Sequence, residues 1–302
     1  MPPAEQILTP AALRDWPLPM PDGGKNSRGR VLVIGGARTA PGAAMLAGQA
    51  ALRVGAGVLT LAVAESVAGP VAAAVPECAV LWLAETAAGS VAASSAEAIQ
   101  RALGSAAAIL IGPGLDDIDE TADLIAALVS AADEDLPIVL DAYAIGALGQ
   151  LPRAAREALA GRLLLTPNHQ ELERLLEAES EPAGSGSGPA SGTDGPADPQ
   201  RLLAERYGAV LSSDNRIVTP AGDRWEVPAG HSGLGTSGSG DVLAGALVGL
   251  LARGAEPVQA ACWATYLHAA AGDRLAARVG SLGFLARELL DQLPLVLTEL
   301  QA

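Results

Sequence analysis

The amino-acid sequence predicts an α/β fold with a mainly parallel central sheet and helices on both of its faces. Its strand candidates are continuous apolar runs rather than alternating ones, which is typical of strands covered on both faces. Amphipathic stretches of helical length separate these runs. Several runs end in Gly, Asp or Asn, and parallel sheets bind their ligands at the carboxyl ends of the strands. We therefore expect the functional site at that edge of the sheet.

The predicted elements follow one another in strand–helix order along the chain. The strand candidates are residues 30–34, 57–64, 106–111, 136–140, 163–165, 210–211 and 216–218. Helix candidates between them include residues 42–54, 118–132 and 170–178. The residues that would meet at the carboxyl edge are Gly35-Gly36, Gly112-Pro113-Gly114, Asp141 and Asn168.

We expect a single domain that spans residues 1–302. Residues 181–199 are dominated by Gly, Ser, Pro and Ala, a composition that cannot bury apolar surface and is typical of a flexible surface segment. Strand and helix candidates resume in the same order after it. We therefore interpret 181–199 as an insertion within one domain rather than as a linker between two.

Composition excludes several classes of function. The net charge of −15 argues against nucleic acid and anionic membranes as partners, whereas a few local N–H groups and one cation suffice for a nucleotide. The most apolar stretch, 43–64, contains Gln49 and Arg53, so it predicts a helix and a strand rather than a membrane span. We find no signal peptide, and Cys78 and Cys262 predict two buried thiols in a reducing cytoplasm. Neither has neighbours at metal-ligand spacing, so we predict no metal site made of protein ligands alone.

A glycine-rich loop, residues 235–240, leads into an apolar run that begins at Val242. Such a loop aims backbone N–H groups and the positive end of a helix dipole at one point, which suits a phosphate or a developing anion. Asp241 would lie in the first helical turn, within reach of a hydroxyl held against that anion. The alternative is a tight turn with a capping aspartate.

With these elements in order, the chain resembles the ADP/ATP-dependent NAD(P)H-hydrate dehydratases, a branch of the ribokinase-like superfamily, over about residues 24–294. The stretches that carry the resemblance are 29–47 with 51–58, 111–115, 236–245 and 260–272. The resemblance implies a three-layer sandwich and a cofactor-repair reaction. In that reaction ADP or ATP, with Mg²⁺, phosphorylates the 6-hydroxyl of hydrated NADH or NADPH, and elimination of the phosphate restores the reduced ring.

The resemblance also implies roles for individual residues. Asp241 would be the catalytic base, and the backbone around Gly238 and Gly240 would hold the transferring phosphoryl group. The hydrated nicotinamide would lie against Ala43, Gly114 and Asn168. Ser212 and Ser213 stand at the positions that contact the nucleotide. Members of this family generally form multimers, so we expect the chain to self-associate.

The sequence departs from the family pattern at positions that leave two alternatives open. Asn168 replaces a histidine, and Asn168-x-x-Glu171 matches a pattern that sugar and vitamin kinases use around Mg²⁺ and phosphate. Tyr143 replaces a carboxylate, and Ser212 replaces a nucleotide-contacting lysine. The first alternative is a small-molecule kinase of the same fold. The second is a catalytically degenerate homologue that binds ligands or partners.

Position 268 is a histidine on a predicted apolar helix. Such a residue is more often a hydrogen-bonded structural side chain than a catalyst, and we expect the structural role for His268.

Overall fold

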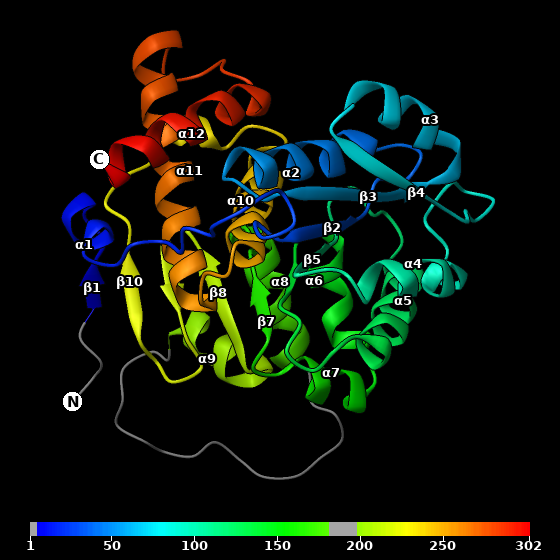
Figure 1. Ribbon diagram of the computed structural model, residues 1–302. Helices are drawn as coiled ribbons and strands as arrows, with labels where there is room; N and C mark the ends of the chain where they lie inside the picture. Colours follow the sequence, from blue (N-terminus) through cyan, green and yellow to red (C-terminus); the bar gives the residue numbers. More distant parts are fainter. Residues whose placement is uncertain (1–4, 181–197) are drawn as a thin grey trace, which may run out of the picture.

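The computed structural model describes residues 5–180 and 198–302 (Figure 1). Residues 181–197, which make up most of the predicted flexible insertion, lie outside the described residues. The strands are β1 (Glu5–Ile7), β2 (Arg30–Ile34), β3 (Val58–Ala64), β4 (Cys78–Leu83), β5 (Ala108–Ile111), β6 (Ile138–Leu140), β7 (Leu163–Leu165), β8 (Ala209–Ser213), β9 (Arg216–Val218) and β10 (Arg224–Glu226). The helices are α1 (Pro10–Arg14), α2 (Pro41–Arg53), α3 (Glu65–Ala74), α4 (Ala96–Leu103), α5 (Ile118–Ala131), α6 (Tyr143–Ala147), α7 (Arg153–Leu159), α8 (His169–Ser180), α9 (Pro199–Tyr207), α10 (Ser239–Ala252), α11 (Pro257–Val279) and α12 (Ala286–Gln301).

The strands form one ten-stranded sheet in the order β1-β10-β9-β8-β7-β6-β5-β2-β3-β4. From β8 to β4 every neighbouring pair is parallel, whereas β9 runs antiparallel to both β8 and β10. Strands β2, β3 and β4 lie side by side in chain order, and the next strand, β5, lies on the other side of β2. This reversal creates a switch point between β2 and β5, where open α/β sheets bind ligands. The predicted α/β class with a mainly parallel sheet is confirmed.

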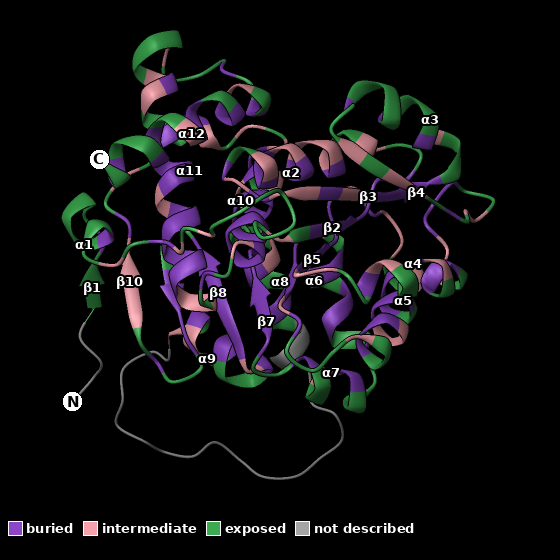
Figure 2. Ribbon diagram, in the orientation of Figure 1, coloured by how far each residue is buried: buried purple, intermediate pink, exposed green. Residues whose placement is uncertain are grey.

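Helices cover both faces of the sheet, and the strand residues alternate between them. Val31 and Val33 of β2 pack in one apolar cluster with α2, α10, α11 and α12. Leu32 and Ile34 pack in the other cluster, with α4, α5, α6 and α7. Figure 2 shows the central strands buried between these two layers. A strand that buries both faces has no polar positions, which explains the continuous apolar runs in the sequence.

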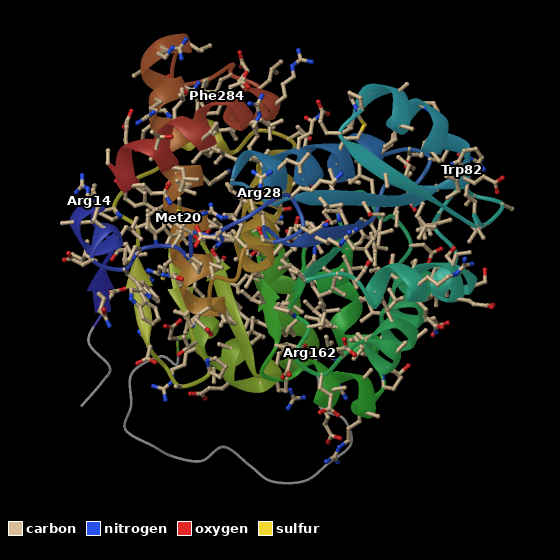
Figure 3. The ribbon with its side chains drawn as sticks, in the orientation of Figure 1. Arg14, Met20, Arg28, Trp82, Arg162 and Phe284 are labelled. Atoms are coloured by element: carbon tan, nitrogen blue, oxygen red, sulfur yellow. The ribbon has the colours of Figure 1, made fainter. Side chains whose placement is uncertain are left out.

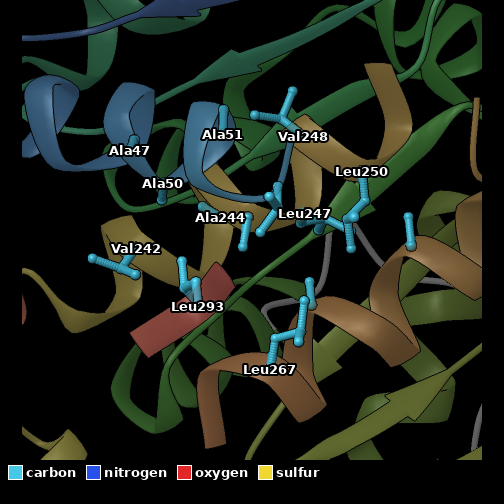
Figure 4. Close-up of a cluster of buried hydrophobic side chains, with 14 of the residues drawn as sticks. Ala47, Ala50, Ala51, Val242, Ala244, Leu247, Val248, Leu250, Leu267 and Leu293 are labelled. Atoms are coloured by element: carbon cyan, nitrogen blue, oxygen red, sulfur yellow. The ribbon is translucent and has the colours of Figure 1, made fainter. Parts of the chain in front are cut away.

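Helices α2 and α10 pack backbone against backbone. A Cβ added at Gly245 would lie 2.1 Å from the Ala47 carbonyl oxygen, and one at Gly249 would lie 2.7 Å from Ala51. Alanines fill the rest of this contact, together with Val242 and Leu247 (Figure 4). Small residues therefore fix the position of α10, whose first turn carries the candidate base.

The edges of the sheet are more exposed than its centre. Trp82 on the edge strand β4 is 59% exposed (Figure 3), and Cys78 on the same strand is only half-buried. Cys262, in contrast, is buried in α11 as expected. Among the described helices, none is long and apolar enough to cross a membrane.

Candidate active site

Two glycine turns meet at the switch point between β2 and β5. The Gly36 N–H donates to the Pro113 carbonyl and the Ala37 N–H donates to the Gly114 carbonyl, both at 2.8 Å. A Cβ added at Gly114 would lie 2.2 Å from the Ala40 carbonyl oxygen and 3.2 Å from the Ala43 Cβ. The structure thus brings Ala43 and Gly114, both predicted substrate contacts, side by side. Only glycine fits where the backbones approach this closely.

The predicted anion hole lies at the start of α10. Gly238 precedes the helix with φ +88°, which favours glycine, and no side chain caps the helix. The first intrahelical bond is from the Val242 N–H to the Gly238 carbonyl at 3.2 Å, so the N–H groups of Gly240 and Asp241 precede it. A Cβ added at Gly238 would lie 3.8 Å from Asp241 Oδ2 and 2.7 Å from Leu46 on α2. The carboxylate therefore lies over the glycine turn, next to the helix that carries Ala43.

Three carboxylates from separate elements lie near one another here: Asp141 after β6, Glu171 in α8 and Asp241 in α10. Burial raises the pKa of Asp141 to about 8, and the charges of Asp241 and Glu171 add to this effect. The Thr166 hydroxyl donates to Asp141 at 2.8 Å, and this hydrogen bond lowers the pKa and so opposes the effect of burial. Burial raises the pKa of Asp241 to about 6, with the charge of Glu171 adding. Such a cluster favours the binding of a cation.

The Asn168-x-x-Glu171 pattern forms a reciprocal cap at the start of α8. The Glu171 N–H donates to Asn168 Oδ1 and the Asn168 N–H donates to Glu171 Oε2, each at 3.0 Å. This is the geometry of a capping box with asparagine at the N-cap. Burial raises the pKa of Glu171, and its bonds with Asn168 oppose the shift. Because helix capping accounts for the pattern, the pattern by itself does not distinguish a kinase.

A cavity of about 490 Å³ lies beside the start of α10. It is lined by four residues with predicted roles, namely Asn168, Ser212, Ser213 and Gly240. The Ser212 hydroxyl lies 2.8 Å from the Thr265 hydroxyl on α11, in the place where the family carries a lysine. Three of the four predicted nucleotide contacts, Ser212, Ser213 and Gly240, therefore share this cavity with Asn168, a predicted substrate contact, whereas Gly238 is not among its lining residues. Ala43 and Gly114 lie at the neighbouring switch point.

Several residues of the site had no predicted role. Asp141 and Glu171 join Asp241 in the carboxylate cluster. The sequence signal for Asp141 was its place just after a buried strand, and the signal for Glu171 was the Asn168-x-x-Glu171 pattern. Ser239 and His268 also line the cavity. His268 is hydrogen-bonded and only 8% exposed, as expected, but its partner is the Ser239 hydroxyl at the start of α10. Sequence spacing gave no sign of that contact.

Known proteins agree with this arrangement. The family model described as NAD(P)H-hydrate dehydratase matches residues 31–295. The chain is 40% identical over 301 residues to the ADP-dependent (S)-NAD(P)H-hydrate dehydratase of Xanthomonas campestris, covering 99% of this chain and 98% of that protein. It is 35% identical to the bifunctional NAD(P)H-hydrate repair enzyme of Moorella thermoacetica, of which it spans only 54%.

Solved structures agree as well. The ADP/ATP-dependent NAD(P)H-hydrate dehydratase of Bacillus subtilis, co-crystallised with ATP and Mg²⁺, superposes with a TM-score of 0.73 and is 25% identical, over 98% of this chain and 99% of that one. A ribokinase from Thermotoga maritima, 14% identical with a TM-score of 0.51 over 88% of this chain and 99% of its own, shares the fold. The fold is thus ribokinase-like, and the chain belongs to the NAD(P)H-hydrate dehydratase family.

Proposed function

We propose that this chain repairs hydrated NADH and NADPH in an ADP- or ATP-dependent dehydration. The nucleotide phosphorylates the 6-hydroxyl of the hydrated ring, and elimination of the phosphate ester restores the dihydronicotinamide. The observation that carries the proposal is the position of Asp241. It stands at the start of a buried helix, over a glycine turn, and beside the cavity that the predicted nucleotide contacts line.

Asp241 accepts the hydroxyl proton in this proposal. Because burial and the charge of Glu171 raise its pKa only to about 6, the carboxylate is ionised in most molecules at neutral pH. The N–H groups of Gly240 and Asp241 point along the helix dipole and donate hydrogen bonds to the phosphoryl oxygens. Ala43, Gly114 and Asn168 would contact the hydrated nicotinamide, as the family resemblance implies.

The nucleotide would occupy the 490 Å³ cavity, where Ser212 and Ser213 form part of the wall. Both serines lie in β8 and are less than 5% exposed. The absence of the family lysine at position 212 means that hydroxyl and backbone groups replace a positive charge there. We therefore expect weaker nucleotide affinity than in relatives that carry the lysine.

A divalent cation fits this site only together with the nucleotide. Among the described residues, no group of three His, Cys, Asp or Glu side chains is arranged to hold a metal ion. Mg²⁺ is commonly bound by one or two carboxylates and completed by substrate phosphates and water. Asp141 and Glu171 would supply the carboxylates. Burial raises the pKa of each, and a bound cation would favour their ionised forms. When bound, Mg²⁺ neutralises charge on the phosphates during transfer.

One assay tests the proposal against both alternatives. Purified protein is incubated with hydrated NADH and either ADP or ATP, and the absorbance of the restored dihydronicotinamide is followed. Turnover with either nucleotide supports cofactor repair. Phosphorylation of a sugar or vitamin precursor, without turnover of the hydrate, would favour the kinase. Nucleotide binding without any turnover would favour the degenerate homologue.

We also propose that the chain is a single domain, that residues 181–199 are an insertion in it, and that it works in the cytoplasm as a homo-oligomer. The family resemblance and the composition support these statements. Light scattering over a wide concentration range tests the oligomer, and a mass near the 30.2 kDa of one chain throughout would contradict it.

A further inference from the structure

A buried hydrogen bond joins the start of α10 to the middle of α11. Ser239 Oγ lies 2.8 Å from His268 Nε2, and the two residues are 3% and 8% exposed. Both residues line the 490 Å³ cavity beside the candidate base. The roles assigned above to Asp241 and to the backbone of the loop make no use of this contact.

Ser239 occupies the first position of α10, between Gly238 and Gly240. Its hydroxyl does not cap the helix, and its N–H donates to the Thr236 carbonyl at 3.2 Å. A Cβ added at Gly240 would meet no atom within 4 Å, so the space beside the serine is open. The hydroxyl therefore stands next to the point where a phosphoryl group would meet the N–H groups of the first turn.

His268 is a neutral imidazole, because burial lowers its pKa to about 4. A neutral ring has one N–H and one nitrogen lone pair, and either can face Ser239. If Nε2 accepts, the only hydrogen of the Ser239 hydroxyl points at the imidazole. The hydroxyl lone pairs then face the cavity, which disfavours phosphate oxygens there. If Nε2 donates, the serine hydrogen is left for another acceptor. An anion in the cavity therefore selects the tautomer that donates from Nε2.

We propose that His268 is a positioning residue that donates from Nε2 to Ser239 Oγ, so that the Ser239 hydroxyl donates its hydrogen to the transferring phosphoryl group. The proposal rests on the proposed function and adds a side-chain donor to the backbone anion hole. No bond is made or broken at Ser239, and the serine keeps its proton throughout.

The surrounding contacts support a positioning role for α11. Thr265 lies one turn before His268, and its hydroxyl lies 2.8 Å from that of Ser212 in β8. Thr265 also donates to the Ala261 carbonyl at 2.8 Å, which fixes its own orientation. One face of α11 thus contacts two elements that line the cavity. Thr265 is hydrogen-bonded to β8, and His268 is hydrogen-bonded to the start of α10.

The first test removes the hydroxyl. Ser239→Ala should lower kcat for dehydration of hydrated NADH about 10²-fold, the usual effect of losing one preorganised donor to a transition state. The KM for ADP should change less than about threefold, since the donor acts on the transferring group. Ser95→Ala is the matched control. Ser95 is equally buried, and its hydroxyl donates to the Ala84 carbonyl away from the cavity.

The second test separates positioning from packing. His268→Gln keeps an N–H donor near the place of Nε2 and should retain most of kcat, whereas His268→Leu should lose about as much as Ser239→Ala. The effects of His268→Leu and Ser239→Ala should not add in the double variant, because both remove the same donor. Additive losses, or equal losses in His268→Gln and His268→Leu, would mean that His268 only packs.

A binding measurement keeps this inference separate from the proposed function. Aluminium fluoride beside ADP imitates a phosphoryl group in transfer from ATP, and beside AMP it imitates transfer from ADP, so its binding needs no substrate turnover. Ser239→Ala should weaken the binding of ADP with aluminium fluoride about tenfold or more and leave the binding of ADP alone nearly unchanged. Equal affinities in wild type and Ser239→Ala would overturn the role of the serine. An inactive wild type that still showed this difference would overturn the proposed reaction alone.

Discussion

The carboxylates of Asp141 and Asp241 interact across the carboxyl edge of the sheet. Burial and then the charge of Asp241 raise the pKa of Asp141 to about 8, while the pKa of Asp241 itself is raised to about 6. At neutral pH the negative charge of this pair therefore resides mainly on Asp241. Two carboxylates with different environments divide their roles in this way, and the one that is ionised is the one placed to accept a proton.

Asp241→Asn should abolish most activity and leave the fold intact. Asparagine has nearly the same size as aspartate and relieves the repulsion within the cluster, but it cannot accept the hydroxyl proton. We expect turnover of hydrated NADH to fall about 10²-fold or more. Steady-state rates and the melting temperature measure the two effects. Nearly full turnover in this variant would show that the base lies elsewhere.

Asp141→Asn should make the ligand-free protein more stable at alkaline pH. A carboxyl whose pKa is about 8 in the folded state stabilises the fold only at low pH, and that contribution is lost as the pH rises toward 8. Asparagine keeps an acceptor for Thr166 without the charge. In urea titrations without Mg²⁺ or nucleotide, we expect the variant to gain about 1 kcal/mol or more at pH 8 relative to wild type.

The gain at Asp141 should shrink toward pH 4, where the unfolded state, with an Asp pKa of about 3.9, begins to take up the proton that the folded state already holds. Asp123→Asn, on the exposed side of α5, serves as the control for the same substitution at an exposed position. A constant difference between Asp141→Asn and wild type from pH 4 to 8 would contradict the assignment.

Gly114→Ala should damage the switch point. Gly114 has φ +74°, and an added Cβ would lie 2.2 Å from the Ala40 carbonyl oxygen, so the two glycine turns would have to separate. We expect a loss of about 2 kcal/mol or more in the free energy of unfolding, together with impaired binding of the hydrated cofactor. Gly104→Ala is the control. Its φ is −61° and no atom lies within 4 Å, so it should be neutral or slightly stabilising.

Arg162→Met should destabilise the fold without changing the site. The Arg162 guanidinium (Figure 3) is buried and donates to the carbonyls of Val129, Asp133 and Ala158, at the ends of α5 and α7. Methionine removes the side-chain donor to all three carbonyls and leaves only Asp133 with another one, the Leu136 N–H, at a cost of about 2–3 kcal/mol. Arg153→Met, which removes an exposed pair with Glu157, should cost less than about 1 kcal/mol.

Calorimetric titration of the Arg162 and Arg153 variants should give wild-type affinity for ADP, because Arg162 precedes β7 and lies at the opposite end of the strands from the site. A large loss of ADP affinity in Arg162→Met would mean that the two ends of the sheet are coupled.

The central strands could be predicted because burial on both faces leaves a plain signal. Residues 31–34, 106–111 and 163–165 are apolar throughout, and β2 (apart from Arg30), β5 and β7 lie within these ranges. The two strands at the β1 side of the sheet gave no comparable signal. β10 is Arg224-Trp225-Glu226 and β1 is Glu5-Gln6-Ile7, and neither is fully buried. A short exposed strand gains its structure from its neighbour rather than from its own composition.

The sequence by itself determined which residues end the strands and which glycines the backbone requires, because both follow from local conformation and from burial. Only the tertiary structure decided which of those ends meet. The placement of β5 beside β2 joins Gly36 to Pro113, and the packing of α10 on α2 brings Asp241 to the same edge. The contact between Ser239 and His268 likewise depends on how α11 lies against α10. Contacts between segments far apart in the chain are set by strand order and helix packing, and no local pattern of residues encodes them.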